Sequence, residues 1–162
     1  MSASISTPEE RLLAAGYRLP PAPQPRGAYA PFHSMPLPGG GQMLTISGQT
    51  CRVNGVAIAG TCEPDAALAP AQETAAIAML NVLAAVSAAC DGALPGSLRV
   101  VRLRGFVRAS PAFQAHTAVL DAASNLLRIA WPDAPLPART AVGVSSLPDG
   151  AMVEIEMDAV LV

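Results

Sequence analysis

The chain has 162 residues, of which 51% are hydrophobic, 14% are charged and 4% are aromatic, and its formal net charge is −2 at pH 7. This length suits a single domain, and the slight negative charge argues against electrostatic binding to nucleic acid or to an anionic membrane surface. The charged share lies well below the roughly 25% that is usual for globular proteins, which favours apolar surface buried against another subunit, although an alanine-rich composition would also lower it.

The first predicted element is a short helix over residues 7–15. Thr7-Pro8-Glu9-Glu10 has the pattern of a capping box with proline at the first helical position. A proline-rich connector follows over residues 19–25. Residues 43–47 then read as a buried strand, and Asn54-Gly55 between short apolar runs predicts a hairpin.

The second half of the chain is predicted to contain both long helices. Residues 71–90 form the longest one, because their apolar side chains recur on one stripe. Residues 98–107 are rich in β-branched side chains and predict a strand. Ser110-Pro111 is expected to cap a second helix that runs to about Ile129. The chain then ends in two strands joined by a turn at Pro148-Asp149-Gly150, which we expect to pair as a hairpin.

This order predicts an α+β domain over the whole chain, 1–162, with two helices on one face of a mixed sheet, because each helix needs a sheet face to cover its apolar stripe. The most apolar stretch, 75–90, falls short of the roughly 20 residues that a membrane span requires. The first eleven residues lack the apolar core of a secretory signal. The three cysteines show no metal-binding spacing, so we expect reduced thiols, a cytoplasmic location and no metal or other cofactor.

Arg139 begins an otherwise apolar strand, which is an unusual position for a guanidinium. A buried arginine needs partners, and its planar fork can hold a small carboxylate through two parallel hydrogen bonds. The other interpretation is an exposed arginine at a strand end that makes a weak surface pair. The residue by itself leaves both interpretations open.

Several motifs occur in a characteristic order around this arginine. Pro137-Ala138-Arg139-Thr140 is followed by Leu147-Pro148 and then by Val153-Glu154-Ile155-Glu156. Upstream lie Gly27-Ala28-Tyr29, Ile46-Ser47-Gly48-Gln49, Asn81-Val82-Leu83 and Gly105-Phe106-Val107. From about Gly27 to the C-terminus, the chain resembles the reactive intermediate deaminase family (RidA/YjgF, also called endoribonuclease L-PSP). The Thr7–Leu12 segment resembles a longer-headed branch of that family.

This resemblance implies a chorismate-mutase-like α+β fold that assembles as a homotrimer with ligand clefts between subunits. The activity that it implies is the hydrolysis of 2-imino acids, or their enamine forms, to 2-oxo acids and ammonia. Such a site requires a cation for the substrate carboxylate, a shielded pocket and a carboxyl group that positions water.

The resemblance assigns the first of these roles to Arg139 and the last to Glu154, which would orient the attacking water or pass a proton to the leaving ammonia. Alternation along the strand places Glu154 on the same face as Glu156 and Asp158, so a solvated acidic face is the alternative. The resemblance also implies six substrate-binding residues: Tyr29, Ser47, Gly48, Phe106, Val107 and Thr140.

Two positions depart from the family pattern. Ala141 stands where many deaminases of the family have cysteine, and Gly143 stands where active members have a charged residue. A non-catalytic trimer that binds a 2-oxo acid through the same arginine is therefore the alternative to an enzyme. An endoribonuclease ranks last, because that activity requires a basic groove and base-stacking aromatic side chains.

Overall fold

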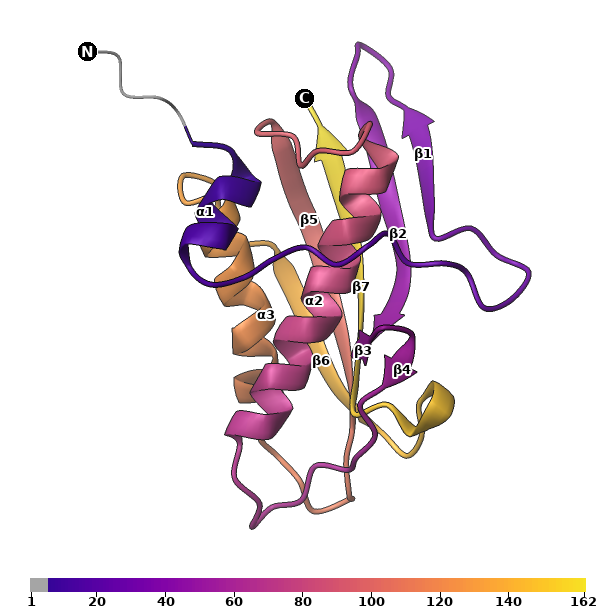
Figure 1. Cartoon of the computed structure of the whole chain (residues 1–162), viewed down its shortest axis with the longest axis vertical. Helices are drawn as coiled ribbons and strands as arrows, with labels where there is room; N and C mark the ends of the chain where they lie inside the picture. Colours follow the sequence, from indigo (N-terminus) through magenta and orange to yellow (C-terminus); the bar gives the residue numbers. More distant parts are fainter. Residues whose placement is uncertain (1–5) are drawn as a thin grey trace.

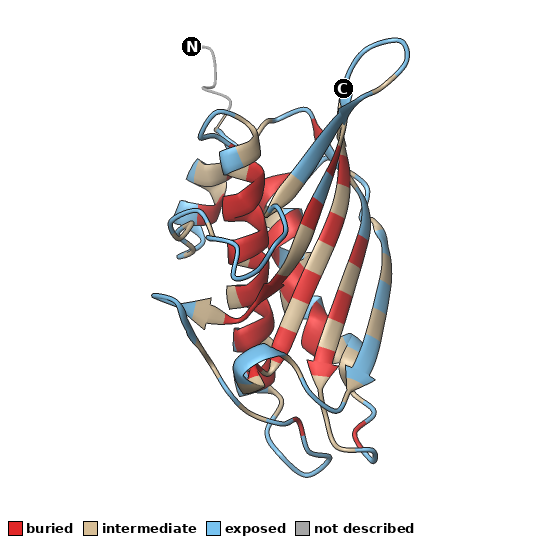
Figure 2. Ribbon diagram, turned by 90° about the vertical axis from the view of Figure 1, so that its right-hand side faces the viewer, coloured by how far each residue is buried: buried red, intermediate tan, exposed pale blue. Residues whose placement is uncertain are grey.

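The computed structural model describes residues 6–162 and contains a five-stranded sheet and a two-stranded hairpin (Figure 1). Seen from the side, the helices lie on one face of the large sheet only (Figure 2). The elements in chain order are α1 (Pro8–Ala14), β1 (Phe32–Pro36), β2 (Gln42–Thr50), β3 (Arg52–Val53), β4 (Val56–Ala57), α2 (Ala69–Ala89), β5 (Leu98–Arg108), α3 (His116–Ala130), β6 (Ala138–Val144), a 3₁₀ turn (Pro148–Gly150) and β7 (Val153–Leu161).

The large sheet has the strand order β1-β2-β7-β5-β6. β5 and β6 run parallel, with α3 as the crossover between them, and the other neighbouring strands are antiparallel. The expected hairpin between the last two strands is therefore wrong. β7 lies between β2 and β5, so the 3₁₀ turn joins two strands that do not pair. β1, at the edge of the sheet, has no counterpart among the predicted elements.

Alternation along β7 separates the two faces of the sheet (Figure 2). Its odd-numbered residues, from Val153 to Ala159, are fully buried beneath the helices, whereas Glu154, Glu156 and Asp158 lie on the opposite, open face. Arg104 on β5 pairs with Glu156 there, and its Nη2 lies 2.9 Å from Asp158 Oδ2. The acidic side chains of this face are therefore partly neutralised by a neighbouring strand.

α2 is the central helix of the layer, and it packs across β7 and β2. Its 21 residues are long and apolar enough to cross a membrane by length and composition alone, because the helix begins at Ala69, ahead of the apolar stretch 75–90. The apolar composition has a structural explanation, because most of the helix is buried against the sheet. Asn81 Nδ2 donates to the carbonyl groups of Thr50 and Arg52 at 3.0 and 3.1 Å, which fixes the helix to the end of β2.

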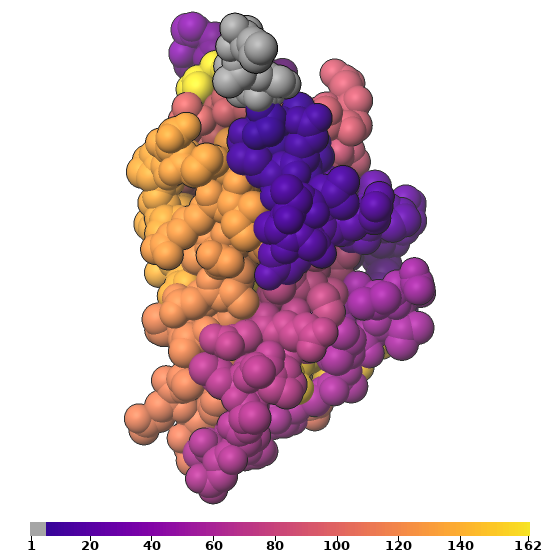
Figure 3. Space-filling model, turned by 60° about the vertical axis from the view of Figure 1, so that its left-hand side comes forward, coloured from indigo at the N-terminus to yellow at the C-terminus, as the bar shows by residue number. Residues whose placement is uncertain are grey.

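α1 has the capping box that the sequence predicts. Thr7 Oγ1 accepts a hydrogen bond from the Glu10 backbone N–H at 3.2 Å, and Glu10 Oε2 accepts one from the Thr7 N–H at 2.8 Å. Leu12 is fully buried, and Arg11 Nε donates to the Ala130 carbonyl at the end of α3 at 2.9 Å. The N-terminal segment therefore lies directly against α3 (Figure 3).

α3 begins at His116, later than the predicted start after Ser110. The Ser110 carbonyl accepts a hydrogen bond from the Phe113 N–H at 3.1 Å, so this serine belongs to a separate turn and does not cap the helix. Phe113 is buried, and its ring meets the ring of His116 edge-on with the centroids 5.0 Å apart. Burial of Phe113 thus stabilises a turn where local sequence favours a helix start.

Gly105 on β5 allows α3 to lie close to the sheet. A Cβ atom at this position would lie 2.9 Å from Leu120 Cγ and closer still to the two methyl carbons of Leu120. Leu120 is fully buried. α3 therefore packs on bare backbone of β5, and this contact fixes its distance from the neighbouring strand β6.

Candidate functional site

Arg139 lies on β6 with its side chain against α3. Its Nη1 donates to Asp121 Oδ1 at 3.0 Å and to Ser124 Oγ at 2.9 Å, and its Nη2 donates to the Thr117 carbonyl at 3.3 Å. The Arg139 side chain is 19% exposed, whereas the Asp121 side chain is 64% exposed. The arginine is therefore partly buried and held by one helix, unlike an exposed residue at a strand end.

These contacts leave one edge of the guanidinium available. Both hydrogens of Nη1 are used, but the hydrogen bonds among residues 6–162 give the Arg139 Nε no acceptor. Nη2 has only the 3.3 Å bond to Thr117. The N–H groups of Nε and Nη2 point in parallel, and this edge can bind a carboxylate through two hydrogen bonds. α3 thus orients the guanidinium while leaving it able to bind an anion.

Arg139 lines an open groove of about 600 Å³, which we call the arginine groove. This volume falls within the range of about 300–1,000 Å³ that is typical of small-molecule sites. The groove lies on the side of the molecule where the N-terminal segment meets α3 (Figure 3). Its lining residues are Tyr17, Gln72, Asp121, Ala122, Ser124, Asn125, Arg128, Leu136, Pro137 and Arg139.

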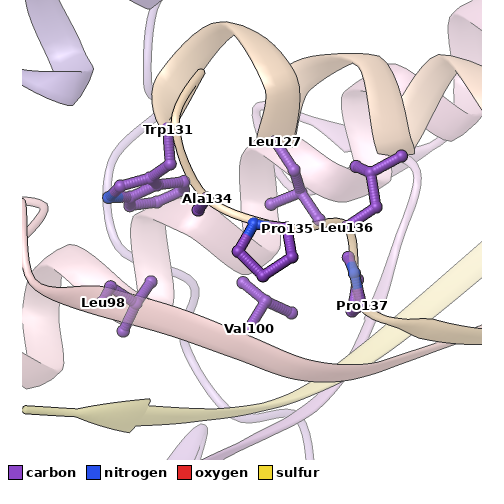
Figure 4. A pocket seen from close by; sticks show the side chains of 8 residues that line it. All are labelled: Leu98, Val100, Leu127, Trp131, Ala134, Pro135, Leu136 and Pro137. Atoms are coloured by element: carbon purple, nitrogen blue, oxygen red, sulfur yellow. The ribbon is translucent and has the colours of Figure 1, made fainter.

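A much smaller apolar cavity, of about 10 Å³, lies beneath the loop 134–137 (Figure 4). Trp131 forms part of its lining, and the Trp131 indole Nε1 donates to the Pro95 carbonyl at 2.9 Å. Its volume is about that of one water probe, which is too small for a substrate. Leu136 and Pro137 line both this cavity and the arginine groove, so apolar packing holds one wall of the groove in place.

Glu154 lies on the open face of the sheet, opposite Thr50 of β2. Partial burial raises the pKa of its carboxyl group, the nearby charge of Glu156 raises this pKa further, and Arg52 partly offsets the shift. A raised pKa suits a carboxyl group that must accept and return a proton near neutral pH.

The bulge in β2 makes room for the Glu154 carboxylate. The register of β2 against β7 shifts between Ile46 and Gln49, and Gly48 lies in this shift. A Cβ atom on Gly48 would lie 3.0 Å from Glu154 Cδ and closer still to Oε1. The adjacent Ser47 is held by its Oγ, which donates to the Ala30 carbonyl at 2.6 Å. The β2 bulge, defined here as Ser47 and Gly48, therefore borders Glu154.

A cluster of charged residues around Asp149 ties the β3–β4 hairpin to the nearby loops. Arg52 and Arg26 contact Asp149 Oδ2 at 2.5 and 3.3 Å, and both donate to the Gly55 carbonyl. The hydrogen bond from Arg52 and the charge of Arg26 lower the pKa of Asp149. Tyr29 is 49% exposed, and its hydroxyl accepts a hydrogen bond from the Arg26 N–H at 3.3 Å. Tyr29 is thus tied to the loops at the β3–β4 hairpin rather than to the arginine groove.

The other predicted binding residues are divided between the core and the surface. Val107 was expected to line a binding cavity, but its side chain is fully buried in the core. Successive residues of a strand point to opposite faces, so Val107 faces the helices while Phe106 faces the open side. Phe106 is partly buried on the open face, directly opposite Glu154 in the register of β5 and β7. Thr140 is exposed on β6 and alternates with Arg139, so it points away from α3.

Arg139 and Glu154 do not meet within one chain. Arg139 makes its side-chain hydrogen bonds with α3 on the helix-covered face, whereas Glu154 points to the open face. β5 also separates the two strands that carry them. The structure therefore places two candidate half-sites, the arginine groove and the β2 bulge with Glu154, on opposite faces of the sheet.

The helical partners of Arg139 were not among the predicted residues. Thr117, Asp121 and Ser124 are spaced four and three residues apart, which places them on one face of α3. This spacing is the signal that could have grouped them. The pattern does not reveal, however, that this face lies against β6.

Ala141 and Gly143 lie two and four residues after Arg139 and therefore on the same, α3-facing side of β6. A Cβ atom on Gly143 would lie 2.5 Å from His116 Nε2, so the imidazole occupies the space above this glycine. Gly143 therefore has a packing role at the start of α3. A charged side chain at this position would require His116 to move.

None of the three cysteines lines the arginine groove. Burial raises the pKa of the Cys62 and Cys90 thiols, and a protonated thiol is a weak nucleophile. Cys51 is also free and buried. Within the described residues, no three His, Cys, Asp or Glu side chains gather closely enough to hold a metal ion.

Comparison with known proteins agrees with this architecture. Protein TCP17 of Trypanosoma cruzi is 33% identical over 143 residues, which cover 87% of this chain and 86% of that protein. A protein of unknown function from Agrobacterium tumefaciens has a solved structure that is 36% identical, with a TM-score of 0.82 over 96% of this chain and 92% of that one. A candidate endoribonuclease from Shewanella oneidensis has a TM-score of 0.83 at 27% identity, over 96% of this chain and 100% of that one.

The family model described as Endoribonuclease L-PSP matches residues 21–161. This match covers the motifs around Arg139 and Glu154 as well as the upstream motifs at Tyr29 and Ser47. It confirms the resemblance that these motifs indicate. The chain therefore belongs to the endoribonuclease L-PSP family, also called the YjgF/RidA family.

Proposed function

We propose that this protein hydrolyses reactive 2-imino acids, and the enamines in equilibrium with them, to 2-oxo acids and ammonia. The observation that carries the proposal is the Arg139 guanidinium, which α3 holds at Nη1 while its Nε–Nη2 edge remains available. A 2-imino acid has its carboxylate next to the carbon that water attacks. A two-bond grip on that carboxylate would therefore orient the reacting carbon.

In the proposed reaction, water adds to the imine carbon, and the resulting carbinolamine loses ammonia as the carbon–oxygen double bond forms. Glu154 takes a proton from the water and passes it to the imine nitrogen, and it then moves the hydroxyl proton of the carbinolamine to the departing nitrogen, so the carboxylate returns to its starting state. The raised pKa of Glu154 supports this role, because a more basic carboxylate accepts the proton more readily. An enamine first gains a proton at carbon and loses one from nitrogen, which converts it into the imine.

This mechanism requires the two half-sites to come from different subunits. The sheet separates Arg139 from Glu154 within one chain, so one substrate can contact both residues only at an interface. We propose a cytoplasmic homotrimer in which the arginine groove of one subunit adjoins the β2 bulge of the next. The open sheet face, which no helix of residues 6–162 covers, and the 14% share of charged residues support burial between subunits.

Ammonia release tests the activity. An imino acid generated in situ by an amino-acid oxidase should lose ammonia faster with the wild-type protein than in buffer. Arg139→Met should lower kcat/KM by roughly a hundredfold, because it removes a two-bond contact to the substrate carboxylate. Arg18→Gln, which changes an exposed arginine outside both the groove and the sheet, is the control and should retain activity. Full activity in folded Arg139→Met would refute the assigned role.

Mixing two inactive variants tests the composite site. Random assembly of equal amounts of Arg139→Met and Glu154→Gln chains should restore about a quarter of wild-type activity, because each working site needs one intact residue from each of two neighbours. Sedimentation should give the mass of a trimer for each preparation. A mixed trimer without any recovered activity would show that both residues act within one subunit.

A non-catalytic protein that binds a 2-oxo acid is the second candidate. One observation favours it: the arginine groove is formed within a single chain, whereas Glu154 lies on the opposite face of the sheet. Ala141 and Gly143 also depart from the pattern of active relatives. Calorimetric binding of a 2-oxo acid to Arg139, combined with no ammonia release from any imino acid tested, would identify this second function.

A further inference from the structure

The arginine groove contains a second cation, Arg128, in the last turn of α3. Arg128 lies four residues after Ser124 and seven after Asp121, so the three residues share one face of the helix. Since an α-helix rises 1.5 Å per residue, Arg128 is about 6 Å along the axis from the serine that holds Arg139. The two guanidinium groups can therefore border one extended ligand.

The two arginines differ in their partners. Arg139 pairs with Asp121 at 3.0 Å, whereas Arg128 is exposed and makes no ion pair with any residue of the described part of the chain. Asp121 is the one acidic residue among the described residues that line the groove. The groove thus keeps one positive charge that the protein does not neutralise.

The position of Arg128 is more informative than its exposure. A cation in the last turn of a helix interacts favourably with the helix dipole, so an exposed arginine there needs no ligand. Arg128, however, lines the same groove as the guanidinium that we assign to the substrate carboxylate. Tyr17 and Asn125 line this groove as well, and both side chains carry a group that can donate hydrogen bonds. This lining suits a ligand with acidic groups at both ends.

We propose that the groove selects ligands with two acidic groups: 2-imino acids whose side chain ends in a carboxylate, and the corresponding 2-oxo dicarboxylates. Arg139 binds the carboxylate beside the reacting carbon, and Arg128 binds the distal one. This inference rests on the proposed function for the role of Arg139. A monocarboxylate makes only the first of the two contacts.

Binding of two 2-oxo acids to the full chain tests this inference. By titration calorimetry, the wild type should bind 2-oxoglutarate roughly tenfold more tightly than 2-oxobutyrate, as expected for one additional charge-assisted contact. Arg128→Gln should weaken 2-oxoglutarate binding by about the same factor and leave 2-oxobutyrate binding unchanged. Arg18→Gln, which changes an exposed arginine that follows α1 and does not line the groove, is the control and should change neither affinity.

Different outcomes separate this inference from the proposed function. The dicarboxylate site would be overturned if Arg128→Gln lost equal affinity for both acids. It would also be overturned if the wild type did not bind 2-oxoglutarate or did not prefer it to 2-oxobutyrate. Loss of the preference in Arg128→Gln would support that site even if the wild type releases no ammonia from imino acids. If the protein releases ammonia from imino acids but its preference for 2-oxoglutarate over 2-oxobutyrate is the same in the wild type and in Arg128→Gln, the deaminase is supported and the dicarboxylate site is refuted.

Discussion

Gly105→Ala tests how the sheet positions α3 and thereby Arg139. The new Cβ atom would lie 2.9 Å from Leu120 Cγ and closer to its methyl carbons, and Leu120 is fully buried. The side chain has no open space to enter, so α3 must move away from β5. Such overpacking costs about 1–3 kcal/mol, and the lower backbone entropy of the unfolded alanine chain offsets roughly 0.4–1 kcal/mol of this.

The net destabilisation of about 1–2 kcal/mol should lower Tm by roughly 2–8 °C for a domain of this size. Because α3 carries Asp121 and Ser124, the same change should weaken the binding of a 2-oxo acid. Leu120→Val shortens the obstructing side chain, so the double variant should be less destabilised than the sum of the single variants. Denaturant unfolding and titration calorimetry measure the two effects.

Gly96→Ala is the matched control, because a Cβ atom there meets nothing within 4 Å. It should raise the free energy of unfolding by roughly 0.4–1 kcal/mol through the same unfolded-state entropy and leave affinity unchanged. Wild-type stability and affinity in Gly105→Ala would show that α3 does not pack on β5 as described. Simple additivity of Gly105→Ala and Leu120→Val would show that Leu120 is not the obstructing side chain.

Three further variants test separate parts of the structure. Glu154→Gln should flatten the pH dependence of the denaturation midpoint. In the wild type, the folded carboxyl group has a higher pKa than the unfolded one and binds its proton more tightly. Wild-type stability should therefore fall as pH rises from the unfolded pKa through the folded pKa, and the amide removes this dependence. Gly48→Ala should slow ammonia release with little change in the unfolding midpoint, because its Cβ displaces the Glu154 carboxylate. Thr7→Ala should lower the free energy of unfolding by about 1 kcal/mol, because α1 loses its side-chain cap.

Each of these variants has an informative opposite result. An unchanged pH profile in Glu154→Gln would mean that the folded carboxyl group titrates like the unfolded one. Normal turnover in Gly48→Ala would show that the β2 bulge has no part in catalysis. Gly40→Ala is not a suitable control for this variant, because Gly40 has a φ of +107°, a backbone conformation that strains alanine. Unaltered stability in Thr7→Ala would indicate that α1 depends on its packing against α3 and not on its cap.

Local patterns predicted most of the elements, because they act over few residues. The capping box at Thr7 and the Asn54-Gly55 turn depend on side chains and backbone angles within one turn, and both are present. The pairing of β6 and β7 was predicted wrongly because a short connection normally joins paired strands. Here β6 pairs with β5 instead, and β7 fills the centre of the sheet.

The candidate site was only partly predictable for the same reason. Alternation placed Glu154, Glu156 and Asp158 on one face, and the structure agrees. Alternation along β6 cannot reveal whether the Arg139 side chain lies on the helix-covered face of the sheet or on the open face. That depends on the pairing of β6 with β5, so the separation of Arg139 from Glu154 emerges only from the fold.

α3 connects the fold with both proposed properties of the arginine groove. Parallel strands need a crossover connection, and the crossover between β5 and β6 is α3, so this helix must lie beside the strand that carries Arg139. Gly105 and Gly143 remove the side chains that would hold it away from the sheet. The face that carries Asp121 is thereby brought onto the guanidinium, and the same face continues to Arg128. If our proposals hold, affinity for the first carboxylate and selectivity for the second both depend on how closely α3 approaches the sheet.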